Sequence, residues 1–119
     1  MVNINTNPLI LDALKDIRLP VEPLTYSGEM TEYITFIDAD NRATDYADDL
    51  DITESAIVQV HYFTPNNPKS KSKEIRKALR NAGFIYLSTS EFYEKEEKYY
   101  HVVIEVRYDD VSETMKGDC

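Results

Sequence analysis

Two stretches of the sequence alternate between apolar and polar side chains, and this alternation constrains the fold more than any other feature. The first stretch, residues 55–63, has an apolar side chain at every second position: Ala56, Val58, Val60 and Tyr62. The second stretch, residues 99–108, repeats the pattern: Tyr100, Val102, Ile104, Val106 and Tyr108. Successive side chains of a strand point to opposite faces of a sheet, so each stretch predicts a strand with one buried face. The chain is therefore expected to build a sheet that is covered on one side.

Three further segments complete the expected sheet. Residues 32–37 are rich in β-branched and aromatic side chains, which fit a pleated surface. Residues 84–90 alternate and are joined to residues 99–108 by a charged link, so these two segments predict an antiparallel hairpin. Residues 38–54 fit a weak strand, a projecting β-arm or a loop, and the sequence does not decide between them.

Two helices are expected, one before the strands and one between them. Asn7 and Pro8 indicate a start for the first helix, over residues 8–18, and Pro20 ends it. The second helix is predicted to be capped by Ser70 or Ser72 and to end at Gly83, a residue suited to the left-handed position after a helix. It has an apolar stripe and a basic stripe at helical spacing. The apolar stripe is Ile75, Ala78, Leu79 and Ala82, and the basic stripe is Lys73, Arg76, Lys77 and Arg80.

These elements define a fold class. The expected fold is α+β, a mainly antiparallel sheet of about four to five strands with two helices packed on one face, in the order α-β-(β)-β-α-β-β. A chain of 119 residues has the size of one domain. Residues 1–108 are predicted to form this single domain, and residues 109–119 a flexible acidic C-terminal tail without periodicity.

Charge is distributed unevenly along the chain. The net charge of −9 argues against general affinity for nucleic acid, because phosphate binding depends on Lys and Arg. Residues 38–54 carry seven acidic side chains and one Arg, whereas residues 69–80 carry six basic side chains and one Glu. Opposite blocks favour pairing between two surfaces. The candidate interface residues are Lys73, Arg76, Lys77 and Arg80 on the basic side and Asp45, Asp48, Asp49 and Asp51 on the acidic side.

The sequence contains no recognisable catalytic, cofactor or metal site. His61 and His101 fall on the less apolar faces of two strands, where they could approach each other near Glu105, but the set is too small for zinc. Residues 38–49 begin like a calcium loop and then lack its glycine and its final glutamate. The three glycines form no phosphate-binding loop, and the lone Cys119 is terminal. The chain is therefore expected to be no enzyme and to use no cofactor.

Location follows from what the sequence lacks. The longest apolar runs fall far short of the roughly 20 residues of a membrane-spanning helix. The first residues do not resemble a secretory signal, so synthesis in a cytosol is expected, without membrane association.

Five groups of residues together have a familiar pattern: 14–21 with 25–28, 32–36, 58–63, 75–80 with 82–84, and 101–105. In these segments the chain resembles the tail-completion proteins of long-tailed phages and prophages of Gram-positive bacteria, which act as tail terminators or head-to-tail joining components. The likeness extends over roughly residues 8–108 and is carried by structural segments rather than by a catalytic signature.

The resemblance implies a non-enzymatic virion protein, made in the host bacterial cytoplasm and located in the tail or neck. It implies a ring of identical subunits, a hexamer in the virion and a monomer when isolated, that caps the tail tube and meets the head connector. DNA would pass through this ring without specific binding. Two alternatives stay open: another neck or minor tail component, and a small regulatory or nucleic-acid-binding module that uses the basic helix.

Overall fold

The computed structural model describes residues 5–42 and 52–111, and it contains two helices and five strands in that part of the chain. The predicted α+β class and the helices on one face of a mainly antiparallel sheet are confirmed. The elements, in chain order, are α1 (Thr6–Ala13), β1 (Val21–Pro23), β2 (Tyr33–Arg42), β3 (Ile52–Thr64), α2 (Lys69–Asn81), β4 (Ile85–Glu94) and β5 (Tyr99–Val111).

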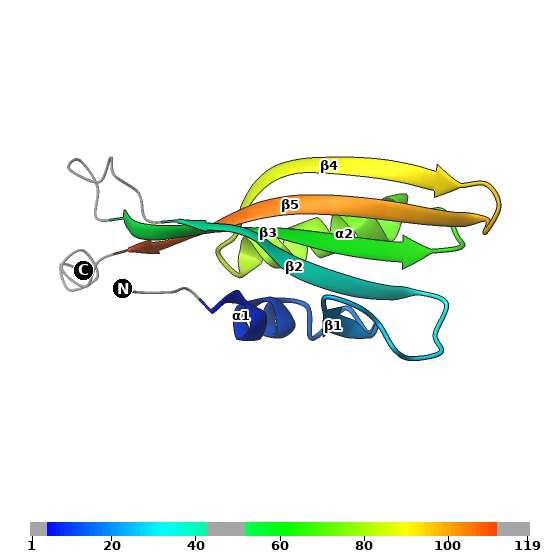
Figure 1. Cartoon of the computed structure of the whole chain (residues 1–119), viewed down its shortest axis with the longest axis horizontal. Coiled ribbons are helices and arrows are strands. Elements are labelled where there is room, and N and C mark those ends of the chain that lie inside the picture. Colours follow the sequence, from blue (N-terminus) through cyan, green and yellow to red (C-terminus); the bar gives the residue numbers. More distant parts are fainter. Residues whose placement is uncertain (1–4, 43–51, 112–119) are drawn as a thin grey trace.

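The sheet has the strand order β1-β2-β3-β5-β4, so β4 and β1 form its two edges (Figure 1). All neighbouring strands are antiparallel except β1 and β2, which are parallel. The longest ladder joins β3 to β5, with Val60 opposite Ile104 near its centre. β1 is a strand that the sequence did not predict, because the optional strand of the predicted order fell in residues 38–54, after the segment that forms the first half of β2.

The core lies between the helices and one face of the sheet. The strands contribute the alternating apolar side chains that the sequence predicted, including Val58, Val60 and Ile104, each fully buried. Ile10 of α1 and Leu79 of α2 pack into the same cluster. Both helices therefore cover one face, and α2 lies behind β3 and β5 in Figure 1. No helix of the described residues covers the opposite face of the sheet.

The first helix differs from its predicted bounds at both ends. It begins at Thr6, because the side chain of Asn5 accepts a hydrogen bond from the Asn7 N–H at 3.3 Å and caps the helix. It ends at Ala13, five residues before the predicted end, and the chain then turns through Arg18, whose φ is +68°. Leu14 and Ile17 are nevertheless buried, so the apolar spacing identified core positions beyond the helix itself.

The predicted serine cap of α2 is wrong, whereas the predicted end is confirmed. The helix begins at Lys69, before Ser70, and Ser72 is buried within its first turns. The Asn67 side chain instead accepts a hydrogen bond from the Lys69 N–H at 3.0 Å, which satisfies a donor at this end. Gly83 follows the helix with a φ of +100°, a conformation that side chains disfavour.

At two places the strands extend beyond the residues whose apolar pattern predicted them. β2 continues to Arg42 and β3 begins at Ile52, so both ends of the acidic stretch belong to strands. β5 continues to Val111, past position 108, where the acidic tail was predicted to begin. Residues 43–51 and 112–119 lie outside the described residues.

Candidate functional site

The four basic side chains of the predicted stripe line one groove. Helical spacing places them on one side of α2, and Tyr86 of β4 closes the groove, which has a volume of about 420 Å³. Lys73, Lys77 and Arg80 are exposed, and Arg76 is half-buried. Within the described residues none of the four forms an ion pair. We call this set, Lys73, Arg76, Lys77, Arg80 and Tyr86, the basic groove.

Arg76 and Tyr86 form the floor of the basic groove. The guanidinium carbon of Arg76 lies 5.6 Å from the centre of the Tyr86 ring, within the range of a cation–π interaction. Tyr86 is itself held by a 2.7 Å hydrogen bond between its hydroxyl and that of Thr89. The Nε atom of Arg76 is buried and has no hydrogen-bond partner among the described residues. The cation–π contact thus orients the guanidinium, while its charge stays within the groove.

This arrangement fits an anionic partner. Unpaired cations converging on one concave surface attract carboxylates or phosphates, and Arg binds both in a planar, two-point manner. The acidic half of the predicted interface, Asp45, Asp48, Asp49 and Asp51, lies outside the described residues. Their pairing with the basic groove therefore stays a prediction.

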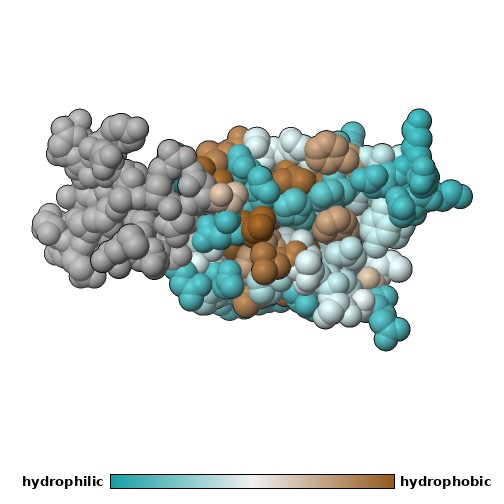
Figure 2. All heavy atoms as spheres, in the orientation of Figure 1, coloured by the Kyte–Doolittle hydropathy of each residue, from teal (hydrophilic) through white to brown (hydrophobic). Residues whose placement is uncertain are grey.

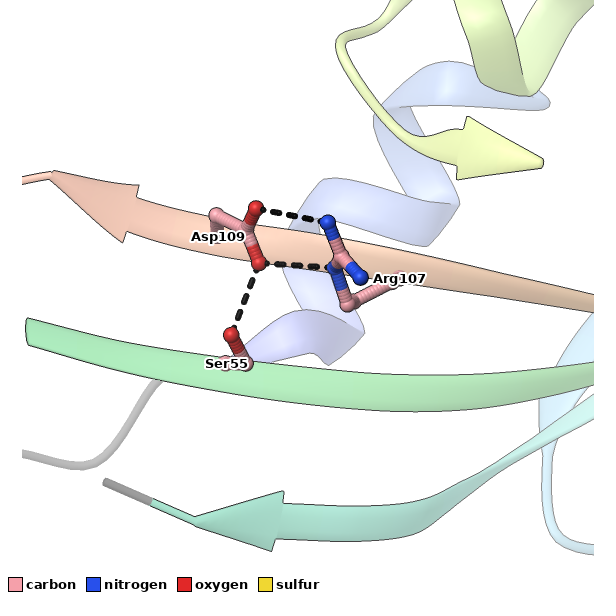
Figure 3. A network of polar contacts seen from close by, with 3 residues as sticks. All are labelled: Ser55, Arg107 and Asp109. Carbon is pink, nitrogen blue, oxygen red and sulfur yellow. Dashed lines mark hydrogen bonds and ion pairs between the residues drawn. The ribbon is translucent and has the colours of Figure 1, made fainter. Parts of the chain in front are cut away.

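The helix-free face of the sheet carries polar side chains that satisfy one another. Asp109 of β5 accepts a hydrogen bond from the Ser55 hydroxyl of β3 at 2.7 Å and two from the Arg107 guanidinium at 3.0 and 3.2 Å (Figure 3). Four residues further along β3 on the same face, Gln59 donates a hydrogen bond to Glu105 at 3.3 Å. Asp109 is thus a structural residue of β5, which explains why the strand passes the predicted start of the tail.

A row of aromatic rings crosses the same face at the other end of the strands. The ring centres of Tyr33 and Phe63 are 4.8 Å apart, those of Phe63 and His101 4.3 Å, and those of His101 and Phe92 6.0 Å. Tyr26, in the connector before β2, extends the row by stacking on Tyr33 at 4.4 Å. Figure 2 shows this side of the molecule as a mixture of apolar and hydrophilic residues rather than one continuous apolar patch.

The two histidines meet beside this aromatic row. β3 and β5 are neighbours, and Nδ1 of His61 lies 2.7 Å from Nε2 of His101, so one ring donates a hydrogen bond to the other. The approach that the sequence suggested is therefore observed. The described residues contain no group of three or more His, Cys, Asp or Glu side chains that could hold a metal ion. The pair is a hydrogen-bonded element of the sheet surface.

Burial lowers the pKa of both histidines. Desolvation is the main cause for each, and the neighbouring ring lowers the pKa of His61 further, whereas Glu94 partly opposes the shift of His101. A histidine with a lowered pKa in the folded state contributes its full stability above the ordinary value of 6.5 and loses it as the pH falls below that value. Protonation of both rings also replaces their hydrogen bond by repulsion.

We therefore expect the free energy of unfolding to decrease when the pH is lowered from about 7.5 to about 5.5, a range in which ordinary carboxylates stay ionised. Urea unfolding at several pH values measures this effect. The double variant His61→Gln, His101→Gln should show a flatter pH dependence over the same range. An unchanged pH dependence in that variant would contradict the assignment to these two rings.

Comparisons with known proteins support the fold. No protein-family model and no curated protein matches the chain. Among solved structures, the chain is similar to one from a structure described as the virion of a native gene transfer agent particle, with 11% sequence identity and a TM-score of 0.51. The match covers 87% of this chain and 84% of the other. At this identity the likeness shows a shared α+β fold.

Sequence reasoning found the basic stripe but missed its aromatic floor. The sequence has nine tyrosines, and no local pattern in it distinguishes Tyr86 from the others. Tyr86 joins the groove because β4 runs beside α2 in the folded domain, a contact that no local pattern indicates. The described part of the chain has no helix that is long and apolar enough to cross a membrane.

Proposed function

We propose that this protein is a non-enzymatic structural component of a virion, and more specifically a tail terminator that caps the tail tube and joins it to the head connector. The observation that carries the proposal is the fold shared with a chain of a gene transfer agent virion over most of both chains. The likeness of the sequence to tail-completion proteins supports the finer role.

The basic groove supplies one side of the contact between subunits in this proposal. A cyclic ring requires two different surfaces on each subunit, because the contact is head to tail. The acidic segment over residues 38–54 is the complementary block of the same chain, and it would meet the basic groove of the next subunit. The net charge of −9 would also repel DNA phosphates, so that a genome passes the ring without adhering.

The other partners follow from the proposed position of the ring between tail and head. One end of the ring would contact the tail tube protein, and the other end the head connector or neck proteins. The protein would be made in the host bacterial cytoplasm and would function in the virion. A hexameric ring on the tube and a less associated free form are the expected states.

The test is capture by tail tubes that lack their terminator. The purified chain is mixed with such tubes, and bound protein is measured by sedimentation and located by electron microscopy. Binding at one end of each tube supports the proposal. Uniform coating of the tube would indicate a different tail component, and the absence of binding at any concentration would overturn the proposal.

Charge reversal in the basic groove should weaken this capture. The double variant Lys77→Glu, Arg80→Glu replaces two exposed cations that attract the acidic block of the next subunit, and we expect about tenfold weaker capture or more. Replacing two residues of the charged hairpin link, Lys95→Glu and Lys98→Glu, makes the same change in net charge away from the groove. Equal losses in both variants would show that net charge alone is responsible.

The groove also favours a second candidate, a nucleic-acid-binding module. Four cations around an aromatic ring could bind phosphates and a stacked base. Binding to a single-stranded oligonucleotide that weakens steeply with added salt, together with indifference to tail tubes, would select this candidate.

A further inference from the structure

The outer edge of β4 is a long strand edge without a partner in the described part of the chain. β4 has ten residues, ends the strand order of the sheet and pairs only with β5 (Figure 1). Such an edge presents a row of backbone N–H and C=O groups that another strand can bind. Proteins usually protect these edges with charges or proline, and β4 has no proline and only two glutamates, Glu91 and Glu94.

Large apolar side chains accompany this edge. Five of the nine large hydrophobic residues that are exposed in the described chain belong to β4, with exposed fractions between 38% and 52%. They are grouped at the two ends of the strand, and the polar residues lie between them. The first group is Ile85, Tyr86 and Leu87, and the second group is Phe92 and Tyr93.

This arrangement is self-complementary when a second β4 is placed antiparallel to the first. The β4–β5 register shifts between Tyr86 and Ser88, so Leu87 is the extra residue of a β-bulge. Tyr86 and Tyr93 lie opposite Val106 and Tyr100 of β5, on the helix-covered face, and Phe92 lies opposite His101 on the open face. When the β4 strand of a second copy is placed antiparallel to the first, with the two Ser90 residues opposite each other, Tyr86 of one copy lies opposite Tyr93 of the other. Both tyrosines are then on the same face of the sheet.

The other positions of this register are also compatible. The bulge residue Leu87 and its neighbour Ser88 come opposite Phe92 of the second copy on the open face. Thr89 comes opposite Glu91, and Ile85 opposite Glu94, so no two like charges face each other directly. Ser90 meets its own counterpart at the centre, where a small polar side chain allows close approach.

We infer that two copies of this chain associate edge to edge through β4, with a two-fold axis at Ser90 and one continuous sheet of ten strands. The axis is perpendicular to the sheet, so the helices of both copies lie on the same side. The contact is isologous, since each copy offers the same strand. This inference uses the geometry of β4 alone and does not depend on the proposed role in a virion.

A single engineered thiol tests the register. In the full chain with Cys119→Ser, the variant Ser90→Cys places two thiols across the axis with their Cβ atoms about 5 Å apart, close enough for a disulfide after a small adjustment. We expect a dimer on a non-reducing gel after mild oxidation. The matched control is Thr89→Cys in the same background, whose two thiols would be about 7–8 Å apart and should crosslink at least about tenfold more slowly.

The mass of the chain in solution tests the association without crosslinking. Light scattering over a concentration series should show a species of twice 13.8 kDa for the natural sequence. The variant Leu87→Lys, Phe92→Lys puts repelling charges at the contact and should remain monomeric. Both side chains are substantially exposed, so its circular dichroism and unfolding transition should stay close to those of the natural protein.

Three results would overturn the inference. They are a strictly monomeric natural chain at all concentrations, equal crosslinking of the Ser90→Cys and Thr89→Cys variants, and undiminished association of the folded lysine variant. A larger assembly that crosslinks through Thr89 rather than Ser90 would also count against this register. Tube capture can succeed or fail independently of each result, so the two proposals are separable.

Discussion

Replacing Val58 by aspartate should leave the protein largely unfolded at neutral pH. Val58 is fully buried in the core between β3 and the helices. A carboxylate at this position loses its hydration and gains no partner, which costs several kcal/mol, and the total stability of a domain is only about 5–15 kcal/mol. Loss of the cooperative unfolding transition, followed by circular dichroism and urea titration, is the expected result.

The neighbouring residue provides the control for this prediction. Ile57 lies on the open face of the same strand, directly opposite Arg107 of β5. Aspartate at position 57 keeps access to water and gains an opposite charge across the ladder, so we expect a loss of no more than about 1 kcal/mol. A similar loss of stability in both variants would contradict the assignment of the two faces.

The substitution Leu79→Ala should have the second largest effect. Leu79 is fully buried and anchors α2 to the sheet. Removing its side chain forfeits apolar burial and leaves a cavity, a change that typically costs about 2–5 kcal/mol. Urea unfolding should show a lower midpoint with little change in slope, because the surface exposed on unfolding stays nearly the same.

Leu11→Ala is the matched control, the same substitution in the other helix. Leu11 is 42% exposed, and alanine is a good helix former, so its loss should stay below about 1 kcal/mol. Because Leu79 also holds the helix that carries the basic groove, the Leu79→Ala variant should lose tube capture at temperatures where the natural chain still binds. An unchanged unfolding midpoint for Leu79→Ala would show that α2 does not depend on this contact.

The proposed tail-terminator role has a different kind of support from the fold. The fold class was predicted from the sequence and is confirmed by the structure. The proposed role is supported by a resemblance of sequence segments and by a fold shared at 11% identity. One fold can serve several functions. Tube capture is therefore the measurement on which the role depends.

The sequence by itself determined which side chains of each element face the core. The alternation in residues 55–63 and 99–108 and the two stripes of α2 are local properties, because the periods of a strand and a helix act over neighbouring residues. For this reason the buried positions Val58, Val60, Ile104 and Leu79 were all anticipated, and so was the basic face. Local signals were less accurate for caps and ends, where Asn5 and Asn67 compete with other capping residues.

Apart from the β4–β5 hairpin, which the sequence predicted, only the tertiary structure decided which of these elements are neighbours. The hydrogen bond between His61 and His101, the contact of Arg76 with Tyr86 and the exposed edge of β4 all depend on the strand order β1-β2-β3-β5-β4. Pairing between distant segments is selected by the packing of the whole core, and no local pattern encodes it. The placement of β3 beside β5 brings the two histidines together, and the placement of β4 at the end of the sheet puts Tyr86 beside α2 and leaves the outer edge of β4 free.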